Sequence, residues 1–104
     1  MKIGRYNYEK STLKNKKLMT IVDGKKVHFG DNRYQHFKDK TGIWSKLNHN
    51  DKKRQRSYLS RAKGIKLKDG SLAWKNPMSP NYHAVRILWW LINVCYKDNN
   101  TYIQ

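Results

Sequence analysis

The clearest pattern of hydrophobic and polar positions in this chain lies in residues 17–30. Two runs rich in β-branched and aromatic residues, 17–22 and 25–30, flank Asp23-Gly24, a pair that tolerates the positive φ angles of a two-residue turn. That turn sets the cross-strand pairs Val22 with Lys25, Thr20 with Val27 and Leu18 with Phe29. The sequence therefore predicts a β-hairpin whose buried face carries Leu18, Val22, Val27 and Phe29, with Lys26 and His28 opposite.

Three later segments carry helix signals. Asp31 is suited to cap a short helix over residues 31–37. A basic segment predicts a second helix, which begins at Asn50 or Asp51 and ends at Gly64, a residue suited to a left-handed cap. Ser79-Pro80 predicts the start of a third helix, which reaches about Tyr96 and has apolar side chains almost all around its axis.

The remaining segments are predicted to be extended. Residues 1–15 show no clear periodicity and indicate an N-terminal arm, while residues 98–104 form a polar C-terminal tail. Residues 65–69 alternate as a strand does, and Asp69-Gly70 is able to close a second hairpin with residues 71–74. The chain of 104 residues thus predicts a small α+β domain over residues 16–97, with an N-terminal β-hairpin and two to three helices.

Charge changes this picture from fold to function. The chain has 23 Lys and Arg residues against 7 Asp and Glu residues, a formal net charge of +16. Self-repulsion of this size opposes folding, so we expect a polyanionic or acidic partner. The longest apolar run, residues 87–92, is too short to span a bilayer, and the first residues lack the apolar stretch of a secretory signal. We therefore expect no membrane partner.

The predicted second helix concentrates the positive charge. Side chains three and four residues apart on a helix lie close together and can follow a phosphate backbone. A solvated helix face is the alternative, because most runs of charge are only that. We favour contact with a polyanion through six residues, namely Lys52, Lys53, Arg54, Arg56, Arg61 and Lys63.

Aromatic residues allow two interpretations. Basic and aromatic residues alternate in several places, as at Arg33-Tyr34, which permits base stacking, although most aromatic residues of a small domain form its core. The apolar end of the third helix is equally compatible with a core position and with a protein interface. That interface would consist of Trp89, Trp90, Leu91 and Ile92.

The sequence gives little support for a metal site or an enzyme. His28, His36, His49, His83 and Cys95 lack the short regular spacing of a zinc motif, so we expect no metal and no cofactor. A lone cysteine excludes an internal disulfide and leaves open a bond between chains. A nuclease with His49 as general base and Asp51 on magnesium is an alternative, but residues 48–51 are better explained as a helix cap.

The order of these motifs resembles a family of short, basic, poorly characterised proteins of large double-stranded DNA viruses and phages. The similarity covers residues 16–89: Lys16 to Met19, the turn with its Val-His-Phe-Gly exit at residues 27–30, Tyr34, Phe37, residues 49–51, Arg54, Tyr58, Arg61, Ser79-Pro80 and Leu88-Trp89. Family members usually end soon after the Leu-Trp pair, and Ala62 stands where a histidine often follows the arginine. The resemblance implies a viral origin and no known catalytic residues.

Together these observations predict a non-enzymatic component of a virus particle, present in the host cell interior before assembly. Its basic helix would contact nucleic acid phosphates or acidic capsid proteins. The alternative is a minor capsid or cement protein, held within a larger assembly by protein contacts and without a nucleic-acid role.

Overall fold

The predicted β-hairpin forms with the predicted register. In the computed structural model, which describes residues 1–90, β4 (Lys16–Val22) and β5 (Lys25–Asp31) pair in antiparallel fashion through the three cross-strand pairs expected from the sequence. Asp23 and Gly24 both have positive φ angles, as the tight turn requires. The predicted inner face is buried, since Leu18, Val22, Val27 and Phe29 are at most 5% exposed.

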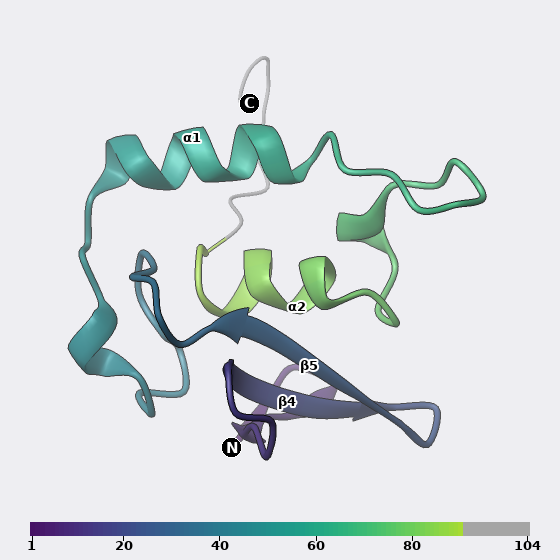
Figure 1. Ribbon diagram of the computed structural model, residues 1–104, viewed down its shortest axis with the longest axis horizontal. Coiled ribbons are helices and arrows are strands. Elements are labelled where there is room, and N and C mark those ends of the chain that lie inside the picture. The colour runs from purple at the N-terminus through teal and green to yellow at the C-terminus, as the bar shows by residue number, and fades with distance from the viewer. Residues whose placement is uncertain (91–104) are drawn as a thin grey trace.

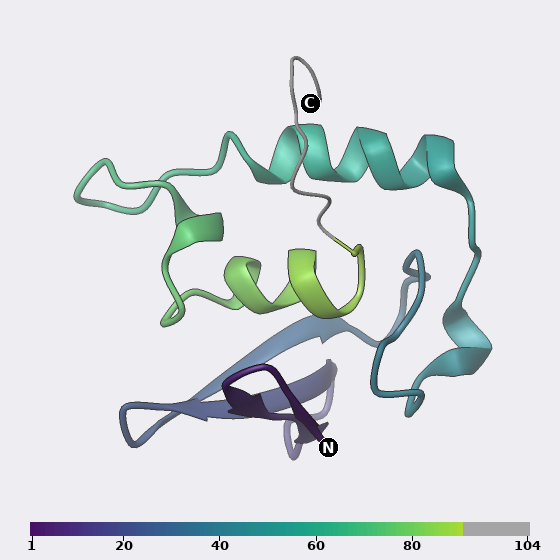
Figure 2. The ribbon, with the colours of Figure 1, turned by 180° about the vertical axis from the view of Figure 1, so that it is seen from behind.

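The first residues extend this hairpin into a larger β structure. β1 (Lys2–Ile3) pairs with β2 (Tyr6–Asn7), and β3 (Glu9–Lys10) pairs with β4, which gives a three-stranded sheet in the order β3-β4-β5. The segment predicted as an arm is therefore extended, and it lies against the hairpin (Figure 2). Tyr8 anchors it, because its buried hydroxyl bonds His83 Nδ1 at 2.8 Å.

Both main helices begin where the sequence predicts. α1 (Lys52–Ala62) is capped by Asp51, whose carboxylate accepts the backbone N–H groups of Lys53 and Arg54. α2 (Pro80–Ile87) is capped by the Ser79 hydroxyl and has proline at its first position. Two short 3-10 helices complete the elements of residues 1–90, η1 (Ser45–Leu47) and η2 (Ala73–Lys75).

α2 lies between the sheet and α1 (Figure 1). On the sheet side, Ala84, Ile87 and Leu88 form one buried cluster with Tyr8, Leu18 and Phe29. On the other side, Val85 forms a second cluster with Leu59 and Ala62 of α1. The apolar residues around α2 thus belong to two cores, which explains why this helix has almost no polar face. The molecule is an α+β domain, as predicted.

The helix predicted over residues 31–37 is absent. Instead of capping a helix, the Asp31 carboxylate accepts hydrogen bonds from the backbone and the side chain of Arg33, and the chain turns. Backbone bonds then tie His36 to Leu47 and His49, on the far side of the loop that contains η1. These long-range bonds replace the local ones of a helix.

The third helix is shorter than predicted, because α2 ends at Ile87 rather than near Tyr96. The last carbonyls of α2 accept backbone bonds from another part of the chain, Lys38 N–H to Leu88 and Lys40 N–H to Ile87, both at 3.0 Å. Trp90 then adopts a φ of 49°, which lies in the left-handed region, so a right-handed helix does not continue through this residue. Leu91, Ile92 and Cys95 lie outside the described residues.

The second hairpin exists only as a turn. Asp69-Gly70 closes a loop in which Lys66 and Leu72 form an isolated antiparallel bridge. The expected second strand is replaced in part by η2.

Candidate functional site

The six basic residues predicted as a contact surface divide between two sides of α1. The helix buries Gln55, Leu59 and Ala62 against the rest of the protein. Lys53, Arg54 and Arg61 line a cleft beside the helix. Lys52 and Arg56 are exposed away from that cleft, while the ammonium of Lys63 lies 5.5 Å from the centre of the Trp74 ring.

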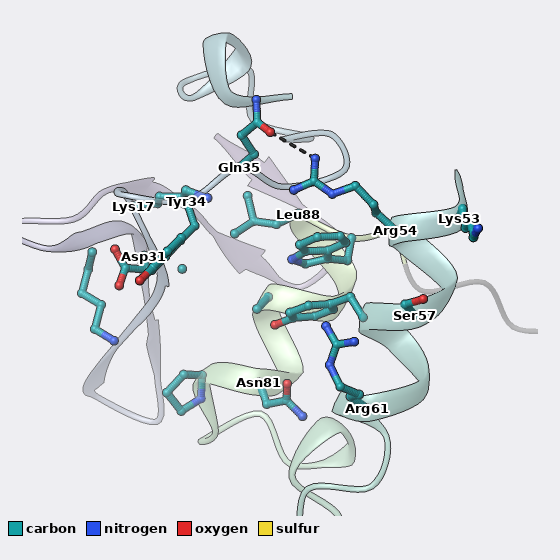
Figure 3. A pocket seen from close by; sticks show the side chains of 16 residues that line it. Lys17, Asp31, Tyr34, Gln35, Lys53, Arg54, Ser57, Arg61, Asn81 and Leu88 are labelled. Atoms are coloured by element: carbon teal, nitrogen blue, oxygen red, sulfur yellow. Dashed lines mark hydrogen bonds between the residues drawn. The ribbon is translucent and has the colours of Figure 1, made fainter. Parts of the chain in front are cut away.

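The cleft is an open cavity of about 720 Å³ bordered by three parts of the fold (Figure 3). α1 forms one wall. The ends of β4 and β5 and the turn that follows them form the opposite wall, and α2 with Trp89 closes the bottom. Residues far apart in the sequence, from Lys16 to Trp89, therefore face a common space.

Positive charge dominates the cleft. Among residues 1–90, five basic residues line it from both walls, against a single acidic residue, Asp31. The charge of that carboxylate is already balanced, because it forms a 2.7 Å ion pair with Arg33. The hydrogen bonds from the side chain and backbone of Arg33 lower the pKa of Asp31 to about 2. An anion would meet little opposing charge here. The basic residues are Lys16, Lys17, Lys53, Arg54 and Arg61.

Lys17 is the least exposed of these cations. Its side chain is 2% exposed, and its ammonium donates a hydrogen bond of 2.8 Å to His36 Nδ1. An ammonium has only donors, so His36 is neutral and its Nε2–H donates to Asn48 Oδ1 at 2.6 Å. Burial lowers the pKa of Lys17 to about 8 and that of His36 to about 4.

Aromatic residues form the apolar part of the cleft. Tyr58 of α1 stacks on Trp89 with ring centres 4.0 Å apart and planes 5° from parallel. Both rings are partly exposed and line the cleft beside Ala84 and Leu88. The side chain of Gln55 holds this end of the chain in place by donating to the backbone oxygens of Trp89 and Trp90.

Several of the other aromatic side chains have a lysine or arginine of the same protein near the ring. The ammonium groups of Lys38 and Lys40 lie 5.2 and 5.4 Å from the centre of the Trp90 ring. Trp44 and Trp74 have similar cations nearby. Of the basic and aromatic residues that are adjacent in the sequence, Arg33-Tyr34 and Trp74-Lys75 form cation–π contacts within the fold.

The residues of the nuclease alternative serve the cap of α1. His49 Nδ1 accepts the backbone N–H of Asp51, and the backbone N–H groups of Arg54 and Lys53 hold the pKa of Asp51 below its usual range. Among residues 1–90, no group of three or more His, Cys, Asp or Glu side chains is arranged to hold a metal ion.

The predicted protein interface is only partly described. Trp89 and Trp90 are partly buried and pack within their own domain, against Tyr58 and Phe37 respectively. Leu91 and Ile92 lie outside the described residues. No contact in the described part of the chain therefore favours docking of these residues into another protein.

Sequence reasoning missed the wall opposite α1. The sequence pattern predicts Lys17 in the first strand of the hairpin and assigns no binding role to Lys16, Lys17, Gln35 or Asn81, which all line the cleft. The sequence offered no signal for this wall, because the burial of Lys17 beside Leu18, which interrupts the alternation expected of a half-buried strand, is visible only in the structure.

Comparisons of this chain with protein-family models, curated proteins and solved structures found no match. The resemblance to viral proteins therefore stays a prediction. Within residues 1–90, every helix is too short or too polar to cross a membrane.

Proposed function

We propose that this chain is a non-enzymatic nucleic-acid-binding protein of a virus particle that holds phosphate groups in and around its basic cleft. The viral origin depends on the sequence resemblance alone. The binding function is supported by one observation above all: Lys16 on one wall and Arg54 and Arg61 on the other line the same cleft, and among residues 1–90 Asp31 is its only acidic lining residue.

Phosphates suit this arrangement better than scattered surface charge would. Cations that converge from two walls act on the same anion, and each phosphate that they neutralise releases condensed counterions. Arginine adds directional donors, since its guanidinium matches the oxygen pairs of a phosphate. Acidic capsid subunits are the other partner predicted from the sequence, and their carboxylates also suit a guanidinium. Absence of nucleic-acid binding would favour them.

A salt titration of binding to labelled DNA, with charge reversals on two sides of α1, tests this proposal. The double variant Arg54→Glu/Arg61→Glu reverses two cations of the cleft, while Lys52→Glu/Arg56→Glu makes the same change of charge outside it. We expect the cleft variant to bind much more weakly and to lose about one unit of salt slope for each phosphate contact removed.

The control variant should keep most of the affinity and slope of the wild type, because its substitutions leave the cleft unchanged. Equal losses in the two variants would mean that net charge, and not the cleft, binds DNA. No binding by the wild type at low salt would reject the nucleic-acid function itself.

A further inference from the structure

The shape of the cleft bears on which form of nucleic acid enters it. Its volume of about 720 Å³ falls within the range of about 300–1,000 Å³ found for small-molecule sites. A duplex presents phosphates on a convex surface and keeps its bases stacked inside, so it reaches only the rim of a concave site. An unpaired nucleotide can leave the strand and occupy the interior.

The lining of the cleft has both chemistries of a nucleotide. Trp89 and Tyr58, both partly exposed, provide an aromatic surface that suits a flat base, and the buried Ala84 and Leu88 lie beneath it. Lys16 on one wall and the arginines of α1 on the other provide the charge that a phosphate requires. A protein that bound phosphates alone would not need this apolar surface.

Asn81 adds a polar group at the bottom of the cleft. Its side-chain nitrogen donates to the backbone oxygen of Ala62 at 3.0 Å, which orients the amide. Figure 3 shows the oxygen of Asn81 turned toward the cavity. A fixed carbonyl oxygen in this position can accept a hydrogen bond from an N–H group on the edge of a base.

We propose that the cleft holds one unpaired nucleotide, with its base against Trp89 and Tyr58 and its phosphate between Lys16 and Arg61. This inference depends on the proposed nucleic-acid function and specifies its ligand: the protein prefers single strands to duplexes because of the base, not only because of the phosphate.

Binding of three labelled probes separates the contribution of the base from that of the phosphate. The probes are an oligothymidylate, its duplex with the complementary strand, and a strand of equal length without bases. We expect the oligothymidylate to bind more tightly than the strand without bases by on the order of tenfold, the effect of stacking one base. The duplex should also bind more weakly than the oligothymidylate, by a comparable factor.

A substitution that fills the cleft without changing any charge tests the location. Ser57 is exposed on α1 and lines the cleft, whereas Ser60 is exposed on the same helix outside it. We expect Ser57→Trp to lose the preference for strands with bases, and the matched control Ser60→Trp to retain it. Circular dichroism establishes that both variants fold.

Photocrosslinking of the wild type provides a second measurement that requires no substitution. A strand containing 5-iodouracil should crosslink to Tyr58 or Trp89, and peptide mass spectrometry identifies the residue. Crosslinks confined to aromatic residues outside the cleft, such as Trp44 or Trp74, would overturn the inference. Displacement by thymidine monophosphate at micromolar concentration would identify a free nucleotide, rather than a strand, as the source of the same ligand.

The outcomes distinguish the two proposals. The inference about an unpaired nucleotide is wrong if the affinities of the three probes depend only on their number of phosphates. It is also wrong if Ser57→Trp keeps the preference for strands with bases. In both cases the nucleic-acid function remains. If none of the probes binds at low salt, the proposed function itself is wrong.

Discussion

At the scale of single residues, the buried pair Lys17 and His36 is the most demanding feature of the molecule. Both side chains are nearly inaccessible, and charging both would place two cations 2.8 Å apart. The fold avoids this by keeping His36 neutral and by using both of its ring nitrogens, one as acceptor from Lys17 and one as donor to Asn48. This arrangement fixes the inner end of the cleft wall.

His36 should make the protein sensitive to acid. Its pKa in the folded protein is about 4, against an ordinary value of 6.5, so between these values the unfolded chain binds a proton that the folded protein does not. The contribution of His36 to stability is therefore fully present above pH 6.5 and falls as the pH drops toward 4, by up to about 1.4 kcal/mol per pH unit. Urea unfolding at a series of pH values measures this slope.

The variant His36→Gln provides the comparison. Glutamine keeps an acceptor and a donor but does not titrate. The slope of the unfolding free energy against pH, between pH 6.5 and 4, should therefore decrease by an amount that corresponds to at most one bound proton. Burial also lowers the pKa of His49 and His83, and their contributions persist in the variant. Identical slopes in the two proteins would show that His36 is not kept neutral by the fold.

At the scale of elements, the sequence predicted what is decided locally. The β4–β5 register follows from a two-residue turn and from alternation along the strands, and the starts of α1 and α2 follow from Asp51 and Ser79. The end of α2 was not predictable in this way. Its last carbonyls are bonded by Lys38 and Lys40, which lie about half the chain away, and no local sequence signal records that contact.

Gly30 of β5 lies where the strand packs against the end of α2, and substituting it tests how tightly the two elements pack. Its φ is 76°, and a Cβ atom added there would lie 2.8 Å from Leu88 Cδ1 and 3.2 Å from Lys17 Cβ. Gly30→Ala should therefore destabilise the protein through both backbone strain and overpacking. The overpacking alone should cost about 1–3 kcal/mol. Thermal or urea unfolding gives the value.

Gly24 is the matched control for the strain. Its φ of 79° is nearly the same, but nothing lies within 4 Å of an added Cβ. Gly24→Ala should cost only the strain of a left-handed residue, about 1–2 kcal/mol. If the two variants lose equal stability, the close approach of α2 to Gly30 does not constrain the fold.

At the scale of the whole molecule, the cleft is a product of tertiary structure. The sequence located one of its walls, the basic helix, but treated its six cations as one surface. Packing of Gln55, Leu59 and Ala62 against α2 decides which of them face the cavity. The opposite wall depends on Lys16 and Lys17 being carried there by the hairpin. No pattern within either segment predicts that the two walls meet.

The net charge of +16 has a consequence that concerns the whole chain. At about 0.01 M salt the Debye length is about 30 Å, which exceeds the radius of gyration of about 13 Å typical of a domain of this length. Every cation then repels every other. At about 0.15 M the Debye length falls to about 8 Å, and only near neighbours still interact.

Salt should therefore stabilise the protein while weakening its binding to nucleic acid. Repulsion is greatest in the compact state, so its screening should raise the melting temperature between about 0.01 M and 0.15 M sodium chloride, whereas the same salt competes with phosphate contacts. Calorimetry and binding titrations measure the two responses. Lys52→Glu/Arg56→Glu lowers the net charge without altering the cleft, so its melting temperature should rise less than that of the wild type. A melting temperature that falls or stays constant with salt would mean that the surplus cations are already compensated within the fold, and that the protein needs no anionic partner to relieve their repulsion.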